Sequence, residues 1–281
     1  MIALHARRSA PSIAAWAATF PDKPLVVVLT GTDLYRDIAT DASAQQSLAL
    51  ATHLVVLQDA GLTALPHALQ AKARVIFQSA PRLKPAAKTS QRFKALMVGH
   101  LREEKDPLTF MQAARLAHAG RGNATMPLYF DQIGDGLDPA LAQAAVASAA
   151  CSTHYRWLRG LPRAVTRQHI KRAHVLVNCS LMEGGAHVIL EAVQSGTPVL
   201  ASRISGNIGM LGADYAGYFE VGDAAGLGAL VRRCAAQPDF LVLLQSQCAR
   251  RACLFAPIEE KRLVLNLASS ALRPRPLKDP P

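Results

Sequence analysis

The sequence predicts an α/β protein with two parallel β-sheets, and three observations support this fold class. Short apolar runs of strand length alternate with amphipathic runs of helical length along most of the 281 residues. Such alternation is typical of parallel strands joined by crossover helices. It breaks once, at a polar, proline-containing stretch over residues 79–94, and then starts again. Half of the residues are hydrophobic and 18% are charged, which indicates a globular chain with a full core.

The first predicted domain covers residues 1–90, in which strand-like and helix-like runs follow one another. The expected strands are MIAL, PLVVVL, LVVLQ and RVIFQS. The expected helices between them cover residues 10–20, 43–53 and 64–72. The strands are short and rich in aliphatic residues, as expected for parallel strands that are covered on both faces.

The second predicted domain covers residues 91–256 and repeats this alternation. Its expected strands are ALMVGH, PLYFDQIGDG, HYRWLRG, HVLVNCS and TPVLAS. Its expected helices are the segment after Glu183 and residues 106–120, 139–150, 164–173 and 224–236. A last helix over residues 257–272 is expected to return toward the first domain. The tail over residues 273–281, RPRPLKDPP, is too rich in proline to fold, and we expect it to be disordered.

Both halves are therefore expected to be Rossmann-like domains. Ligands of such sheets bind beyond the carboxyl ends of the strands, so two facing domains would form a cleft. A Rossmann-like half normally begins with its own βα units, each βαβ unit taking about 30 residues. Here Met1 already lies in a predicted strand. We therefore expect the first domain to be incomplete and the natural start to lie upstream of Met1.

The formal net charge of +11 suggests an anionic partner, but it does not suggest nucleic acid. Only 5% of the residues are aromatic, and they do not alternate with the basic residues as a base-stacking surface requires. No apolar run approaches the length of a membrane span, and two arginines directly after MIALHA disfavour a signal peptide. Five cysteines without a CxxC pair predict reduced thiols in a cytoplasmic protein. The histidines show no metal-ligand spacing, so no metal site is expected.

The stretch EGGAHVILEAVQSGTPVLAS, residues 183–202, contains the strongest functional signal. It places Glu183 before a predicted helix and Glu191 about two turns inside that helix. Gly184 and Gly185 would leave backbone N–H groups free at the helix start, where anions are favoured. A buried carboxylate needs a polar partner, and sugar hydroxyls are suitable ones. The pattern predicts two sugar-binding acids with a diphosphate between them, although a loop acid and an internal helix charge would look similar.

A second stretch, VGHLREEKDP over residues 98–107, also falls at a predicted strand end. Gly99 would let an anion approach the backbone, and Arg102 and Lys105 could neutralise a diphosphate. An ordinary surface loop would explain the same residues. The glycine turn IGDG that follows another predicted strand is equally consistent with a plain turn and with a ligand contact.

Taken together, these motifs resemble the retaining glycosyltransferases of the GT-B fold that carry a Glu-x7-Glu motif. The resemblance implies that Lys105 binds the nucleotide diphosphate, Glu183 lies by the donor sugar and Glu191 holds the ribose. Arg102 would replace the arginine that the family has directly after the loop glycine, where this chain has a histidine. The remaining implied donor contacts are Gly99, Gly184, Gly185, Ala186, His187 and Asn207, the last in a loop facing the donor pocket. The family's aromatic–glycine pair after Gly184 is absent.

A closer resemblance connects LHARRSA, LTGTDLYRDI, EGGAHVILEA and RRACLFAP with the selenosugar synthases of selenoneine biosynthesis. It implies transfer of a sugar from a UDP-sugar, with UDP-N-acetylglucosamine expected, to selenophosphate, which forms a carbon–selenium bond. UDP-sugar and selenophosphate would be the only partners, with no cofactor, nucleic acid or membrane, and the oligomeric state is left open. The candidate acceptor residues, at strand ends of the first half, are His5, Arg7, Arg8, Thr30, Gly31, Thr32 and Asp33. Asp33 could equally cap the LYRDI turn, and Arg7 and Arg8 could be a plain surface pair.

Three other functions stay open. A UDP-sugar glycosyltransferase could use a lipid or polysaccharide acceptor, although residues 10–20 contain one Trp and no Lys for a membrane surface. A UDP-sugar epimerase of the same fold would need further acid and base groups beside Glu183. The chain could also be an inactive remnant that binds nucleotide sugars.

Overall fold

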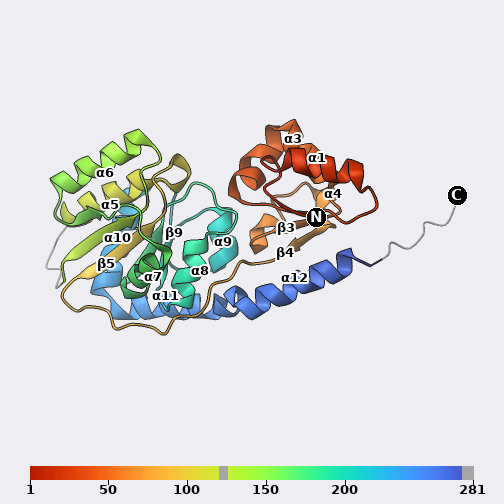
Figure 1. The fold of residues 1–281 in the computed structure, drawn as a ribbon. Helices are drawn as coiled ribbons and strands as arrows, with labels where there is room; N and C mark the ends of the chain where they lie inside the picture. The colour runs from red at the N-terminus through yellow and green to blue at the C-terminus, as the bar shows by residue number, and fades with distance from the viewer. Residues whose placement is uncertain (120–125, 274–281) are drawn as a thin grey trace.

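The computed structural model describes residues 1–119 and 126–273 and contains two α/β domains joined by an extended segment (Figure 1). The N-terminal sheet has the strand order β1-β2-β3-β4, and the C-terminal sheet has the order β10-β9-β8-β5-β6-β7. Neighbouring strands are parallel in both sheets. The fold class that the sequence predicts, α/β with parallel sheets, is confirmed.

The N-terminal domain is small, and its strands are shorter than the apolar runs that predict them. The strands are β1 (Ile2–Leu4), β2 (Val26–Val28), β3 (His53–Val56) and β4 (Ala73–Val75). The helices are α1 (Ala10–Thr19), α2 (Ile38–Thr40), α3 (Ala42–Leu50) and α4 (His67–Gln70), with a π-helical turn η1 (Asp33–Asp37) and a 3-10 turn η2 (Asp59–Gly61). Alternate strand residues point to opposite faces, so Val27 and Leu54 pack with α1 and α3, while Val26 and Val55 lie in a separate cluster on the other face.

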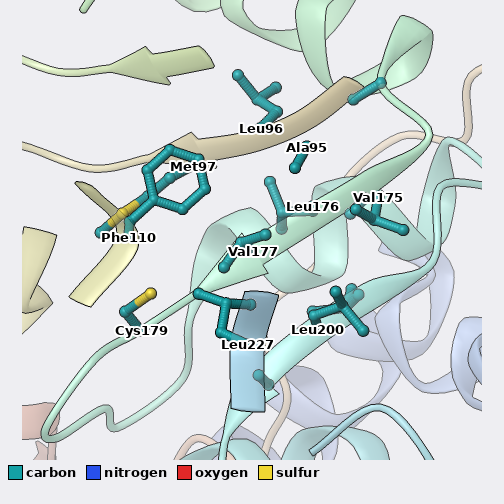
Figure 2. Packing of buried hydrophobic residues seen from close by; sticks show 14 of the residues in the cluster. Ala95, Leu96, Met97, Phe110, Val175, Leu176, Val177, Cys179, Leu200 and Leu227 are labelled. Atoms are coloured by element: carbon teal, nitrogen blue, oxygen red, sulfur yellow. The ribbon is translucent and has the colours of Figure 1, made fainter. Parts of the chain in front are cut away.

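The C-terminal domain carries the larger core. Its strands are β5 (Phe93–Val98), β6 (Leu128–Ile133), β7 (Tyr155–Trp157), β8 (Val175–Asn178), β9 (Val199–Ser202) and β10 (Tyr218–Phe219). Its helices are α5 (Pro107–Ala119), α6 (Pro139–Cys151), α7 (Arg163–Arg172), α8 (His187–Gln194), α9 (Ser205–Leu211), α10 (Ala224–Ala236) and α11 (Pro238–Arg251), with 3-10 turns η3 (Glu103–Lys105) and η4 (Ala252–Phe255). All residues of β8 and β9 are buried, because helices cover both faces of the sheet. Figure 2 shows this packing, with Phe110 of α5 against Met97 of β5.

The last helix, α12 (Pro257–Ala271), links the two domains. It starts beside the C-terminal domain and runs beneath the N-terminal sheet (Figure 1). Leu267 packs into the cluster of Val26 and Val55 on the outer face of that sheet. Ser79 of the connecting segment donates a hydrogen bond of 2.5 Å to Oε2 of Glu260. The helix therefore covers a sheet face that would otherwise be exposed to water.

Several boundaries differ from the prediction. The helix expected directly after Glu183 begins only at His187, because the intervening glycines contact the other domain. Residues 205–211, expected as a loop, form α9, and α11 was not predicted. The polar stretch ends before Phe93, where β5 begins. Two predicted segments lie partly outside the described residues. They are the last residue of the helix expected over 106–120 and residues 274–281 of the expected tail.

Candidate active site

The candidate site lies where the carboxyl ends of the strands of both sheets meet. Among the described residues other than glycine, His5, Asp106 and Arg159 have a positive φ, at 70°, 44° and 62°. They lie in the loops that follow β1, β5 and β7. Such backbone conformations are costly for residues with a Cβ and are often found at functional sites. The unusual backbone therefore gathers at the edge where parallel sheets bind their ligands.

Lys105 and Glu183, which come from two separate sequence motifs, are in direct contact. The Nζ of Lys105 in η3 donates a hydrogen bond to Oε1 of Glu183, and Ser180 Oγ donates a second one of 2.7 Å to the same oxygen. Glu183 is only 8% exposed. A carboxylate at this depth needs a partner, and here it has a cation and a hydroxyl. The structure thus brings together the acid and the cation that the sequence predicts for donor binding.

The glycines after Glu183 pack against the N-terminal domain. A Cβ on Gly184 would lie 2.4 Å from the carbonyl carbon of Thr30, and one on Gly185 would lie 2.8 Å from Cβ of Leu57. Gly31 in turn lies so close that its own Cβ would be 3.0 Å from the Gly184 nitrogen. The expectation that these glycines open the helix is wrong, because α8 begins at His187 with Ala186 as its N-cap. Their lack of side chains instead allows the two domains to touch.

Glu191, in the second turn of α8, is held through one of its two carboxylate oxygens. Its Oε1 lies 3.3 Å from Nη2 of Arg163, 3.8 Å from Nε of Arg167 and 3.4 Å from Nε2 of His187. Burial opposes ionisation of this residue, but the contacts with His187 and Arg163 hold the pKa of the carboxyl below its usual value. Oε2 accepts no hydrogen bond from the described residues and is not sealed from solvent. One oxygen is thus fixed, and the other is available to a ligand.

Arg163 and Arg167 are not among the residues that the sequence motifs predict for the site. They stand four residues apart near the start of α7, so they lie on one face of that helix. This spacing was visible in the sequence. What the sequence does not give is the packing of α7 beside α8, which directs that face toward Glu191.

A cavity of 410 Å³ lies at the ends of β5 and β6 and the start of α7. Gly99 of the first motif and Gly134 and Asp135 of the IGDG turn are among the residues that line it. A Cβ on Gly134, whose φ is 151°, would lie 1.9 Å from the carbonyl oxygen of Gly99. The two turns can approach this closely because Gly134 has no side chain. The IGDG turn therefore shapes a cavity and is more than a connection.

One predicted donor contact does not lie where it was expected. Asn207 was expected in a loop facing the donor pocket, but it lies inside α9 and is fully buried. Its Nδ2 donates hydrogen bonds of 2.9 Å to O and 3.1 Å to Oγ of Ser202, which ties α9 to the end of β9. Arg102 is exposed, and its side chain makes no hydrogen bond or ion pair within residues 1–119 and 126–273. It lies in the same loop as Lys105 but does not reach Glu183.

The candidate acceptor residues form a hydrogen-bonded network at the ends of β1 and β2. Asp33 accepts hydrogen bonds from the backbone nitrogens of Thr30, at 2.7 Å, and Ala6, at 2.8 Å. Asp33 is fully buried and fastens the two strand ends together, whereas Thr32 occupies the N-cap of η1. His5 Nε2 lies 3.0 Å from Thr32 Oγ1. These contacts make Asp33 a structural residue of this loop.

The two arginines after His5 differ from each other. Arg7 lies 3.5 Å from Asp37 and 3.7 Å from Asp41. Arg8 is exposed, and its side chain has no partner among the described residues. Arg8 is therefore the freer cation of the pair.

Two α/β domains with parallel sheets whose strand ends face each other are the architecture of the GT-B fold. In agreement, the family model for "Glycosyl transferases group 1" matches residues 82–240, more than half of the chain. The chain belongs to this family. No described helix is both long and apolar enough to cross a membrane.

Known proteins show similarity in both sequence and structure. Glycosyltransferase 1 domain-containing protein 1 of Xenopus tropicalis is 31% identical over 112 residues, which cover 40% of this chain and 31% of that protein. HepE of Anabaena, solved with UDP and glucose, superposes with a TM-score of 0.76 at 16% identity over 96% of this chain and 78% of its own. Sucrose-phosphate synthase of Thermosynechococcus elongatus superposes with a TM-score of 0.77 at 16% identity, over 96% of this chain and 72% of its own. These structural similarities show the fold. The chain spans about a third of the Xenopus protein and half of the S. aureus protein TarM.

Proposed function

We propose that this protein transfers a sugar from a UDP-sugar, UDP-N-acetylglucosamine, to selenophosphate. The observation that carries the donor half of this proposal is the arrangement of Lys105, Glu183 and Glu191 at the strand ends. One acid is paired with a cation that a diphosphate could take over, and the other acid presents a free oxygen. The cation could bind the diphosphate of a UDP-sugar, and the two carboxylates could bind hydroxyls of its hexose and its ribose.

The proposed donor follows the edge of the C-terminal sheet. The base would enter the 410 Å³ cavity beside Gly99, a ribose hydroxyl would donate to Oε2 of Glu191, and the diphosphate would lie by Lys105. The sugar would then lie next to Glu183, at the contact between the two domains. Structural neighbours support a UDP-sugar as the class of donor, because HepE was solved with UDP-glucose and a pneumococcal O-GlcNAc transferase was solved with UDP and GlcNAc.

The acceptor half of the proposal depends on the resemblance of the motifs and on the cations of the N-terminal domain. Arg8 is exposed and has no partner among the described residues, and Arg7 lies beside it. Both follow β1 on the side of the sheet where the domains meet. A small, multiply charged anion such as selenophosphate fits such arginines, since guanidinium groups bind phosphate oxygens in pairs.

In the proposed reaction, the bond between the anomeric carbon and the diphosphate oxygen breaks and a bond from that carbon to selenium forms. UDP leaves with the electron pair, and Lys105 stabilises the charge that develops on its diphosphate. Lys105 must first exchange its contact with Glu183 for one with the donor. Selenium in selenophosphate is already an anionic nucleophile, so no general base is needed to remove a proton. We propose that no metal cofactor takes part.

The direct test is release of UDP from UDP-N-acetylglucosamine by the purified chain, with and without selenophosphate. We expect release that depends on selenophosphate and survives EDTA. Glu183→Gln should lower the rate by about 100-fold, a typical cost of removing one electrostatic group from an active site. The matched control is Glu220→Gln, since Glu220 is 73% exposed and pairs only with Arg203 among the described residues. UDP release at equal rates without selenophosphate, or no turnover of any UDP-sugar, would contradict the proposal.

A further inference from the structure

A second, larger cavity lies at the opposite edge of the N-terminal sheet, away from the candidate active site. Its volume is 780 Å³. Segments that lead into β2, β3 and β4 line one side of it, and the last turn of α12 with the residues after it lines the other. A cavity of this size matches the sites that bind small molecules, which are about 300–1,000 Å³.

The lining of this cavity is strongly basic. Its four cations come from both sides and are Lys23, Lys72, Arg74 and Arg273. Asp22 is the one carboxylate in the lining. Within the described part of the chain, none of the four cations forms an ion pair with a carboxylate. The positive charge around the cavity is therefore not neutralised by the protein.

Part of this charge has a structural use. Lys72 Nζ donates hydrogen bonds of 2.7 Å to the carbonyl oxygens of Leu48 and Ala51 at the end of α3, where a helix favours a cation. Burial lowers the pKa of this lysine. Arg74 donates through Nη1 to the carbonyl oxygens of Ala71 and Ala73. These two cations are partly committed to the backbone.

The other two cations, Lys23 and Arg273, are not committed in this way. Both are exposed, and neither side chain makes a hydrogen bond within residues 1–119 and 126–273. They belong to opposite sides of the cavity, Lys23 to the loop before β2 and Arg273 to the segment after α12. Two unpaired cations that face one cavity from two elements would both gain from a shared anion.

We propose that this cavity is a second anion site, which binds a small molecule with two or more phosphate groups. The volume exceeds the need of a single phosphate, and the spread of cations over two sides fits an elongated, multiply charged ligand. Bound there, the ligand would connect the end of α12 to the N-terminal domain. Because α12 starts beside the C-terminal domain, such a ligand would also stabilise the present arrangement of the two domains.

Isothermal titration calorimetry with inorganic pyrophosphate tests the site in the full-length chain. The titration uses a Lys105→Ala background, so that the cation at the donor site does not contribute. We expect binding, and we expect the added pair Lys23→Ala with Arg273→Ala to weaken it by about tenfold or more, since each removes a charge-assisted contact. The matched control is Arg250→Ala with Lys261→Ala, two exposed cations outside the cavity, and it should change the affinity by less than about twofold.

Hydrogen exchange in the wild-type chain locates the site independently. Pyrophosphate should slow amide exchange at residues 268–272, and the Lys23→Ala, Arg273→Ala pair should abolish that protection. The proposal is overturned if affinity falls equally in the control pair, or if exchange slows only near Lys105. Sedimentation with phosphatidylglycerol vesicles tests whether the cavity binds a membrane headgroup and not a free ligand. Vesicle binding without any binding of pyrophosphate would also overturn it.

Discussion

Replacing Lys105 by methionine should destabilise the folded protein through Glu183. That carboxylate is 8% exposed and accepts hydrogen bonds from Lys105 and Ser180. Loss of one partner from a buried ion pair costs about 3–5 kcal/mol, because the remaining charge stays desolvated. The Lys105 side chain is 21% exposed and Ser180 would still donate. We therefore expect a smaller loss, about 2 kcal/mol in the free energy of unfolding.

A double-mutant cycle separates this interaction from other effects of the substitution. Glu183→Gln removes the charge that would be left unpaired, so Lys105→Met with Glu183→Gln should be more stable than Lys105→Met alone by about 1 kcal/mol. The four proteins are compared by urea unfolding followed by circular dichroism. Additive effects, within about 0.5 kcal/mol, would refute the reasoning, because they would show that the two side chains do not interact in solution.

Three further predictions follow from particular contacts. Glu191→Gln should weaken UDP binding by about tenfold in calorimetry, because the ribose loses a charged acceptor; unchanged affinity would remove Glu191 from the site. Gly209→Ala should destabilise the chain by about 1–3 kcal/mol in urea, since its Cβ would lie 1.7 Å from the buried Oε1 of Gln58, whereas Gly228→Ala has room and should not. Burial lowers the pKa of Lys88 from 10.5 to about 8, so the folded protein releases this proton at a lower pH than the unfolded chain. Stability relative to Lys88→Met should therefore rise between pH 8 and 10.5, and a flat difference would contradict this.

The alternation of apolar runs was enough to predict the parallel sheets, because helices cover both faces of the central strands β8 and β9. The buried runs of β8 and β9 and the long helix α10 were found at nearly their observed positions. The helix expected at Gly184 shows the limit of such patterns. Glycines before a helix are read as its start, but here they make room for Thr30 of the other domain. Contact between domains is a long-range property that no local spacing reports.

In the candidate site, too, local patterns predicted some residues, whereas long-range packing decided the places of others. Lys105 and Glu183 were selected by their residue types at strand ends, and the structure places them in contact. Asn207 was expected in a loop, whereas residues 205–211 form α9 and bury its amide. The contacts of Arg163 and Arg167 with Glu191 depend on which face of α7 packs against α8. That orientation follows from the packing of the sheet and is not encoded in either segment alone.

The most direct test of the account is a crystal structure of this chain with UDP. We expect the base in the cavity beside Gly99, a ribose hydroxyl within hydrogen-bonding distance of Oε2 of Glu191, and Lys105 on the diphosphate and no longer on Glu183. A nucleotide bound anywhere else, or bound while Lys105 remains on Glu183, would contradict the central claim.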